Sequence, residues 1–379
     1  MIVMCVCHCD ETNDFGGLEK QAFTLANELA KTHSVVMLSS TRKLSNVGWS
    51  KINGIDTLRL WTYTTPQVSG KKLPASLIWA VQLLIWLIKN RKKVDVFHCH
   101  QIRIHAFVAA FMNKYFNTKT ILKSGVGGPG ADINVISTHK YFGKRGQRFV
   151  VENNSHFISI TETISKDLLK AGVKKDFISV IPNGFETPKV IKNKADKSKH
   201  LKNFVFLGRI ESDKNIVELV EAALELLKEY EFVLNIYGKG QLKSQIEGLV
   251  LKQQASKNIK IFDYISDIPS VLVNNCWFVL PSDAEGLSNA MIEAMTYGAV
   301  PIVTKVSGAV DHIVEDENGY FIDGFDKQAI KKSLLKALNT EPEKWDLMSD
   351  NCKHLAIDRF SLQKVAGQYS NLYEKLRSK

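Results

Sequence analysis

The stretch WFVLPSDAEGLSNAMIEAM, residues 277–295, predicts a strand, a tight loop and the first turns of a helix. Its apolar first four residues are typical of a buried strand, which the following proline ends. The later run AMIEAM is helical in pattern. Free backbone N–H groups at a helix N-terminus, beside the carboxyl edge of a strand, bind anions and above all phosphate. Because Glu285 and Glu293 flank this loop, the stretch predicts a phosphate ligand that also needs two carboxylates.

Apolar strand-like runs alternate with helical patterns along the whole chain, which is typical of mostly parallel α/β sheets. In the first half the expected strands are 2–7, 35–39, 94–99, 119–123, 156–160 and 178–181, and the expected helices are 17–31, 74–90, 103–114 and 162–171. In the second half the expected strands are 204–207, 232–237, 259–262, 277–280 and 300–304, and the expected helices are 214–229, 241–254, 266–273 and 288–297. A polar, Lys-rich break at 187–203 reads as a linker. The pattern predicts two doubly wound domains, 1–186 and 204–361, facing each other across a cleft.

The 379 residues carry a formal net charge of +11, and this charge is unevenly distributed. Residues 1–190 hold 25 Lys and Arg against 13 Asp and Glu, whereas residues 191–379 hold 25 against 26. A basic first half indicates an anionic partner there, either nucleic acid or an anionic membrane surface. The six cysteines lie mostly in apolar runs, which fits buried thiols in a cytosolic protein, and no signal peptide is visible.

Two other loops of the second domain leave predicted strands at the same edge. The first carries Arg209 and Lys214, which would clamp a diphosphate, although a surface pair has the same pattern. The second carries Gly238 and Gly240, which allow the backbone to approach a ligand closely.

These features together resemble the retaining family 4 glycosyltransferases, the glycosyl transferases of group 1. The matching residues are Gly208-Arg209, Lys214-Asn215, Gly238-Lys239-Gly240, Pro281-Ser282, Glu285-Gly286, Glu293-Ala294-Met295, Gly298 and Pro301-Ile302-Val303. The likeness extends to IPNG, residues 181–184, at the family's interdomain junction, and to a terminal helix at 362–379 that crosses back onto the first domain. It implies the GT-B fold, in which a nucleotide-sugar binds mainly to the second of two Rossmann-like domains.

The resemblance also implies a role for each residue. Glu285 would contact sugar hydroxyls near the reacting carbon, and Glu293 would hold the nucleotide ribose. Arg209 and Lys214 would bind the diphosphate. Together with Glu285 and with His100 of the first domain they form the expected catalytic set. The remaining donor-binding residues would be Gly16, Gly17, Gly208, Gly238, Ile265, Gly286, Leu287, Ser288 and Asn289.

The acceptor side is expected in the first domain, around the loop 122–134. Lys123 stands where many family members carry a histidine, and Asp132 would contact the acceptor. Residues 125–130 satisfy G-x-G-x-x-G, but Pro129 lacks an N–H where phosphate needs a donor, so a dinucleotide site is disfavoured. His100 ends a strand and would point into the cleft; packing at the strand end is the alternative.

The pattern D-x-D is absent from the sequence, and a metal-dependent enzyme would need such carboxylates beside the diphosphate. We therefore expect transfer with no essential metal and no other cofactor. The expected helix within 77–93 is apolar on nearly every face from Leu77 to Ile88 and ends in a cluster of cations at 89–93. It is either buried in an α/β layer or seated in a membrane interface.

The sequence thus predicts a retaining glycosyltransferase that moves a sugar from a UDP- or GDP-sugar to a hydroxyl. The acceptor would be a lipid-linked glycan or saccharide of bacterial surface polysaccharide synthesis. We expect a cytoplasmic protein, peripheral on the anionic inner face of the membrane, with no nucleic-acid partner. The alternatives are a GT-B nucleotide-sugar 2-epimerase and an inactive module that binds membranes or nucleic acid.

Overall fold

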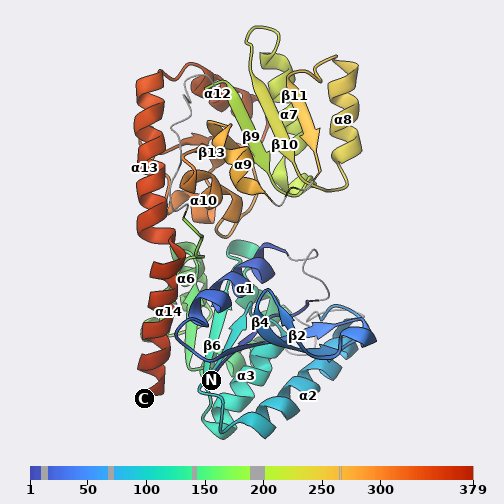
Figure 1. Ribbon diagram of the computed structural model, residues 1–379, viewed down its shortest axis with the longest axis vertical. Coiled ribbons are helices and arrows are strands. Elements are labelled where there is room, and N and C mark those ends of the chain that lie inside the picture. Colours follow the sequence, from blue (N-terminus) through green and yellow to red (C-terminus); the bar gives the residue numbers. More distant parts are fainter. Residues whose placement is uncertain are drawn as a thin grey trace. The chain divides into compact units, whose positions relative to one another are not determined.

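The computed structural model describes residues 1–9, 16–66, 72–138, 143–187, 201–263, 265 and 267–378. The chain forms two compact units (Figure 1). The first comprises Met1–Gly184 and Leu362–Lys379, and the second Phe185–Ser361. The expected linker at 187–203 lies mostly outside the described residues. Each unit is a Rossmann-like α/β domain, which confirms the predicted fold class.

The first unit is built on an eight-stranded sheet in the order β3-β4-β2-β1-β5-β6-β7-β8. The pairings between its strands are parallel except that of β3 with β4, which is an antiparallel hairpin. The strands are β1 Ile2–Cys5, β2 Val35–Thr41, β3 Gly48–Ile52, β4 Ile55–Trp61, β5 Val96–His100, β6 Lys119–Ser124, β7 His156–Ser159 and β8 Ile178–Val180. The strand order reverses between β1 and β5.

The helices of the first unit cover both faces of this sheet (Figure 1). They are α1 Gly17–Leu29, α2 Leu73–Asn90, α3 Ile104–Phe116, α4 Asp132–Ser137, α5 Gly143–Glu152, α6 Glu162–Lys170 and the terminal α14 Leu362–Arg377. In α14 the apolar positions recur at helical spacing, so Val365, Tyr369, Leu372 and Tyr373 form one buried face. This face shares a core with α1 and β1, which joins the end of the chain to its beginning.

The second unit has a six-stranded parallel sheet in the order β11-β10-β9-β12-β13-β14. Its strands are β9 Asn203–Leu207, β10 Val233–Tyr237, β11 Ile259–Phe262, β12 Trp277–Leu280, β13 Val300–Thr304 and β14 Tyr320–Ile322. The order reverses between β9 and β12. In doubly wound sheets ligands bind outside the carboxyl ends of the strands at such a switch point.

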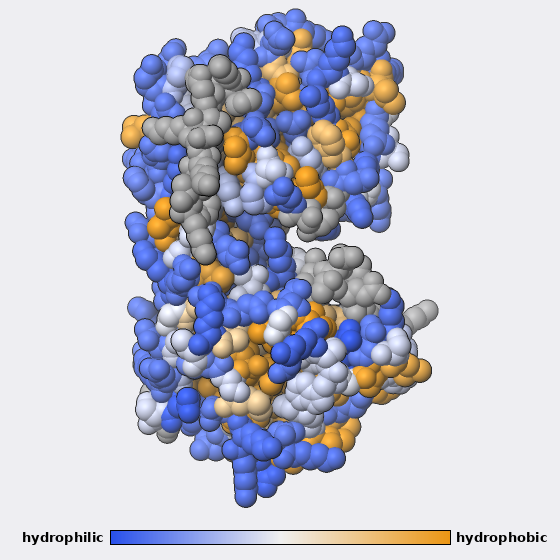
Figure 2. Space-filling view, in the orientation of Figure 1, coloured by the Kyte–Doolittle hydropathy of each residue, from blue (hydrophilic) through white to orange (hydrophobic). Residues whose placement is uncertain are grey.

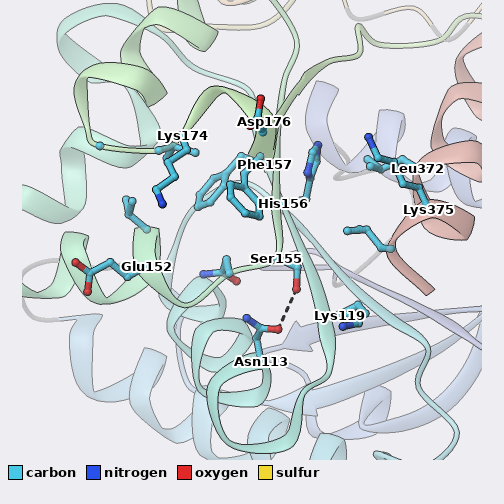
Figure 3. A pocket seen from close by; sticks show the side chains of 16 residues that line it. Asn113, Lys119, Glu152, Ser155, His156, Phe157, Lys174, Asp176, Leu372 and Lys375 are labelled. Carbon is cyan, nitrogen blue, oxygen red and sulfur yellow. Dashed lines mark hydrogen bonds between the residues drawn. The ribbon is translucent and has the colours of Figure 1, made fainter. Parts of the chain in front are cut away.

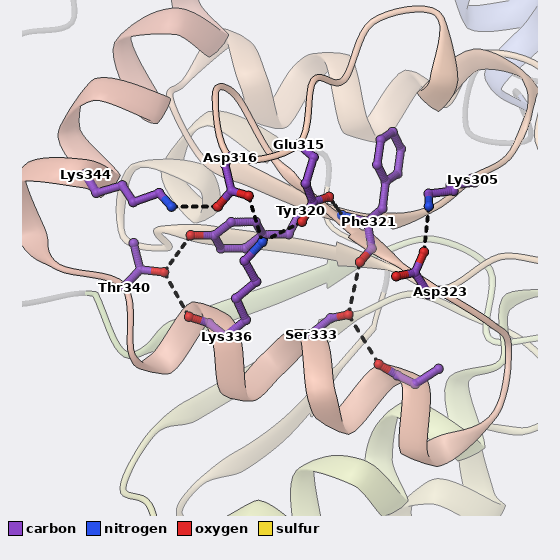
Figure 4. Close-up of polar contacts among 11 residues, drawn as sticks. Lys305, Glu315, Asp316, Tyr320, Phe321, Asp323, Ser333, Lys336, Thr340 and Lys344 are labelled. Carbon is purple, nitrogen blue, oxygen red and sulfur yellow. Dashed lines mark hydrogen bonds and ion pairs between the residues drawn. The ribbon is translucent and has the colours of Figure 1, made fainter.

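The helices of the second unit are α7 Ile216–Leu226, α8 Lys243–Lys252, α9 Ile268–Val273, α10 Asn289–Thr296, α11 Ser307–Val310, α12 Lys327–Leu338 and α13 Pro342–Phe360. Polar contacts around the buried ring of Tyr320 fasten α12 to the edge strand β14 (Figure 4). The ammonium of Lys336 lies 4.2 Å from the centre of that ring and donates to Glu315 Oε1 at 2.6 Å. The Ser333 hydroxyl donates to the Phe321 carbonyl at 3.2 Å.

Several elements were not expected from the sequence. They are the hairpin β3–β4, the strand β14 and the helices α4, α5, α11, α12 and α13. The six cysteines are buried and free, as expected.

Candidate functional site

The loop between β12 and α10 lies at the switch point of the second sheet. It ends at Ser288, whose hydroxyl accepts a hydrogen bond from the Met291 N–H at 3.3 Å and so caps α10. The Leu287 side chain is buried, so its backbone rather than its side chain is available to a ligand. The first turn of α10 therefore presents N–H groups and the positive end of the helix dipole at the strand edge.

Glu285 and Lys214 form an ion pair in this loop region. Lys214 Nζ donates to Glu285 Oε1 at 2.8 Å, and the Ser282 hydroxyl donates to the same oxygen at 3.2 Å. The Lys214 side chain is 10% exposed and that of Glu285 is 21% exposed. Because the pair is largely withdrawn from water, it fixes the position of both charges at the switch point.

Arg209 and Lys214 share a second carboxylate. Asp213 Oδ2 lies 2.8 Å from an Arg209 terminal nitrogen and 3.1 Å from Lys214 Nζ. The Arg209 and Asp213 side chains are 67% and 42% exposed, so their pair is weak and open to exchange with a ligand anion. A diphosphate would take the place of Asp213 on these cations.

Asn215 ties the two loops of the switch point together. It adopts a left-handed conformation with φ of 47° as the cap of α7. Its amide donates to the Pro281 carbonyl at 2.9 Å and to Asp283 Oδ1 at 2.6 Å. The sequence motif included Asn215, but no role was predicted for it. Its place directly after Lys214 was the feature of the sequence that could have indicated this role.

The glycines of this region are required by close backbone approaches. A Cβ atom on Gly238 would lie 1.9 Å from the carbonyl oxygen of Gly208, and one on Gly240 would lie 2.1 Å from that of Ile210. These two glycines, which were expected to let the backbone approach a ligand closely, let two loops of the protein pack together. Gly308, which sequence reasoning missed, does the same for the third loop, since its Cβ would lie 2.3 Å from the carbonyl oxygen of Gly286.

Of the other residues expected to bind a donor, Glu293 and Asn289 lie on α10 and Ile265 follows β11. Glu293 is half-buried on α10, and its charge adds to the burial that raises the pKa of the Tyr297 hydroxyl. Asn289 is the first residue of α10 and Ile265 is half-buried. Tyr264, next to Ile265, lies outside the described residues.

Two family models match this chain. Residues 16–184 match a glycosyl transferase 4-like domain, and residues 189–354 match the glycosyl transferases group 1. The chain belongs to the group 1 glycosyltransferases.

Curated relatives agree with this assignment. A Staphylococcus aureus capsular polysaccharide biosynthesis glycosyltransferase, CapM, is 28% identical over 263 residues, which are 64% of this chain and 68% of CapM. An Escherichia coli UDP-Gal:alpha-D-GlcNAc-diphosphoundecaprenol alpha-1,3-galactosyltransferase is 29% identical over 209 residues, 52% of this chain and 54% of the relative. The match therefore spans about half the length of the galactosyltransferase.

Solved structures share the fold at low identity. The sucrose-phosphate synthase of Thermosynechococcus elongatus superposes with a TM-score of 0.80 at 17% identity, covering 100% of this chain and 99% of the other. The Anabaena protein HepE, in complex with UDP, gives 0.74 at 14% identity, covering 99% and 100%. Both are GT-B structures, and the likeness shows the fold.

In the first unit of this glycosyltransferase, His100 and Lys123 face each other across β5 and β6 and are buried. Lys123 Nζ donates to Asn183 Oδ1 at 2.9 Å, and burial lowers the pKa of its ammonium to about 7. Burial, with the nearby His98 and Lys123 charges, lowers the pKa of His100, so its ring is neutral. Its Nε2 has no hydrogen-bond partner among the residues that the structure describes.

Asp132 and the loop before it are folded on each other. The buried carboxylate of Asp132 accepts from the Gly125 N–H at 3.0 Å, and Asp167 accepts from the Gly128 N–H at 2.7 Å. Because these carboxylates already accept hydrogen bonds from the Gly125 and Gly128 N–H groups, the G-x-G-x-x-G run does not form a phosphate-binding loop here.

Gly16 and Gly17 open helix α1 and are exposed, and the Glu19 carboxylate lies beside Gly16. Gly16 is the cap residue, with extended backbone, and a Cβ on it would lie 2.8 Å from Glu19 Oε2. Burial raises the pKa of the Glu19 carboxyl, whereas hydrogen bonds from the backbone of Glu19 and Gly16 lower it. Glu19 is thus a capping residue of α1.

A hollow of about 470 Å³ in the first unit lies away from these loops (Figure 3). Its walls include Lys119 and His156, which begin β6 and β7, and Leu372 of α14. It therefore opens at the amino ends of the strands, opposite to the edge where a doubly wound sheet binds its ligand. No group of three or more His, Cys, Asp or Glu residues is placed to hold a metal ion in the described part of the chain.

Proposed function

We propose that this glycosyltransferase moves a hexosyl group from a UDP-sugar to a hydroxyl of a lipid-linked glycan, with retention of configuration and without an essential metal. The setting would be bacterial surface polysaccharide synthesis. The observation that carries the proposal is the Lys214–Glu285 ion pair, 2.8 Å long, at the switch point beside the N-terminus of α10.

The positive charges at the switch point of the second sheet would favour the departure of a nucleoside diphosphate. When the bond between the sugar C1 and the β-phosphate oxygen breaks, the phosphate gains negative charge. Arg209, Lys214 and the first N–H groups of α10 would stabilise this charge from fixed positions. This arrangement supplies the neutralisation that a divalent cation would otherwise supply.

We infer retention by attack on the face that the phosphate leaves, a route that needs no protein nucleophile. Glu285 Oε1 already accepts hydrogen bonds from Lys214 and Ser282, which suits a carboxylate that holds a sugar hydroxyl. The acceptor oxygen would form its bond to C1 on the face that the phosphate leaves. The acceptor proton would pass to a phosphate oxygen, so that atoms and charges balance.

Comparisons support the choice of substrates. HepE structures contain UDP or UDP-glucose, and the Escherichia coli relative is named for UDP-Gal and a diphosphoundecaprenol-linked acceptor. CapM is named for capsular polysaccharide biosynthesis. We therefore place UDP ahead of GDP and a lipid-linked glycan ahead of a soluble saccharide.

Calorimetric titration with UDP and with GDP in EDTA tests the donor site, using wild type and Arg209→Ala. We expect UDP to bind without metal and the variant to bind about tenfold more weakly, because it loses a charge-assisted hydrogen bond. Binding of GDP alone would overturn the donor assignment. A requirement for Mg²⁺ would overturn metal independence.

Incubation with UDP-sugars, with and without an extract of polyprenyl-diphosphate glycans, tests the reaction. UDP release that depends on the extract, with a product of the donor's anomeric configuration by NMR, is the expected result. Interconversion of UDP-sugars without acceptor would instead identify an epimerase. An inverted product would overturn the retaining mechanism.

A further inference from the structure

Helix α2 of the first unit has two apolar faces, and one of them is packed inside the unit. Trp79, Leu83 and Leu87 recur every four residues and are fully buried. The Trp79 ring contacts His105 of α3 at a centroid distance of 5.7 Å. This face anchors α2 to the rest of the first unit.

The other apolar face of α2 is open to solvent. Its members Leu77, Ile78, Val81 and Ile85 are each between 40% and 54% exposed. Gln82 is the polar residue in the middle of the helix. Its side-chain amide points away from this apolar face and donates to the Trp61 carbonyl at 2.8 Å. Apolar side chains gather over α2 at the lower right edge of the molecule in Figure 2. Contiguous apolar patches of this kind mark interaction surfaces.

Two tryptophans extend this face. Trp49 of β3 is 55% exposed, and its ring contacts that of Trp86 at 6.2 Å. Tryptophan is enriched where an apolar phase meets water, because its ring is apolar and its N–H is polar. We call Trp49, Leu77, Ile78, Val81, Ile85 and Trp86 the α2 surface.

A cluster of cations adjoins the C-terminal end of α2. Lys89, Arg91, Lys92 and Lys93 are exposed, and the sequence holds no Asp or Glu between Asp56 and Asp95. The Arg91 guanidinium lies 5.8 Å from the ring centre of Phe116, at the end of α3. Next to it, Tyr115 is 59% exposed and Lys114 lies 5.6 Å from its ring centre. Cations and exposed aromatic rings beside an apolar face match the headgroup region of an anionic bilayer.

The packing of α2 decides between spanning the membrane and lying on it. By length and composition α2 is the one described helix that could cross a membrane. A crossing helix would have to withdraw Trp79, Leu83 and Leu87 from the first unit, where they are fully buried. A helix that keeps one face in the protein and the other in the lipid lies in the interface.

We propose that the α2 surface and its cationic end bind the first unit to a membrane containing anionic phospholipid. The apolar face enters the acyl boundary, while Lys89, Arg91, Lys92 and Lys93 lie among the lipid phosphates. The enzyme is thereby held at the surface where a lipid-linked acceptor is presented. The docking itself does not depend on the donor chemistry.

Co-sedimentation of the full chain with vesicles tests the proposal. One set of vesicles contains phosphatidylcholine with phosphatidylglycerol, and the other contains phosphatidylcholine alone. We expect binding to the anionic vesicles that weakens with salt. Val81→Ser with Ile85→Ser should reduce binding at least about tenfold through lost apolar burial. Lys92→Gln with Lys93→Gln should reduce it about twenty-fivefold, or about fivefold for each cation.

The matched control is Leu251→Ser with Lys252→Gln, an exposed apolar and cationic pair at the end of α8 in the second unit. It should bind vesicles like the wild type, and every variant should keep wild-type UDP binding and circular dichroism. Quenching of Trp49 and Trp86 by brominated lipid should be lost with the α2 variants.

Absence of vesicle binding, equal binding to both vesicle types, or an equal loss in the control would each overturn the proposal. A lipid-free dimer that becomes a monomer on Val81→Ser with Ile85→Ser would show instead that a second copy of the chain covers this face. If the wild type did not bind UDP, the proposed donor site would be wrong, whereas the result on membrane binding would still stand.

Discussion

Replacing Lys214 by methionine tests the ion pair on which the proposed donor site depends. Methionine keeps much of the volume of the lysine side chain but removes its charge. Glu285 then loses the partner at 2.8 Å and keeps the Ser282 hydroxyl at 3.2 Å. The change therefore leaves a carboxylate, 21% exposed, at the switch point with one hydrogen-bond donor fewer.

The burial of the pair sets the expected size of the effect. Breaking a fully buried ion pair costs about 3–5 kcal/mol, because an uncompensated charge stays in a poor solvent. Here Glu285 retains a hydroxyl donor and some contact with water, so we expect the free energy of unfolding to fall by about 2 kcal/mol. Loss of one charged hydrogen bond to the diphosphate should weaken UDP binding by about 2 kcal/mol, or about thirtyfold.

Urea unfolding and calorimetric titration with UDP measure the two quantities separately. The matched control is Lys327→Met, which breaks a shorter pair of 2.6 Å with Glu225 at about one-third exposure. Such a pair is screened by water and contributes little, and Glu225 lies at the far end of α7 from the switch point. If Lys214→Met bound UDP within about twofold of the wild type, Lys214 would have no part in the donor site.

Five further substitutions have defined outcomes. Arg209→Ala should weaken UDP binding in calorimetric titration. It should change the unfolding free energy by less than about 0.5 kcal/mol, because the ion pair of Arg209 with Asp213 is exposed. Asp213→Asn should bind UDP at least as tightly as the wild type in the same calorimetric titration. Gly240→Ala should destabilise the second unit by more than about 2 kcal/mol in urea unfolding, since its Cβ would lie 2.1 Å from a carbonyl oxygen. Gly248→Ala on α8, where the added Cβ meets nothing within 4 Å, should stabilise it by about 0.5–1 kcal/mol. Burial lowers the pKa of Lys123 from 10.5 to about 7, so the unfolded chain binds more protons between these pH values and stability should rise with pH there. Lys123→Met should abolish this rise, and a slope unchanged in the variant would contradict the assignment.

The periodicity of the sequence determined the alternation of strands and helices and therefore the two Rossmann-like units. Buried parallel strands read as continuous apolar runs, which is why β12 and β13 were found. The hairpin β3–β4 was missed because its strand Gly48–Ile52 alternates in burial and carries Lys51 and Ser50 on a sheet edge. Such a strand is stabilised by its pairing with β4 rather than by its own composition.

The family motif also singled out Glu285, Arg209 and Lys214 at fixed places after predicted strands, and the structure brings these side chains together at the carboxyl edge of the second sheet. It did not show that Lys214 pairs with Glu285, which are 71 residues apart in sequence. It also missed Gly308, because the need for glycine there arises from the Gly286 carbonyl of another loop.

The sequence by itself thus determined which elements form and which residues meet at the carboxyl edge of the second sheet. Only the tertiary structure decided which charges pair, which glycines are required by a neighbouring loop, and which face of α2 stays in solvent. Local periodicity specifies secondary structure, whereas ion pairs, close approaches and exposed faces depend on residues that are distant in the chain.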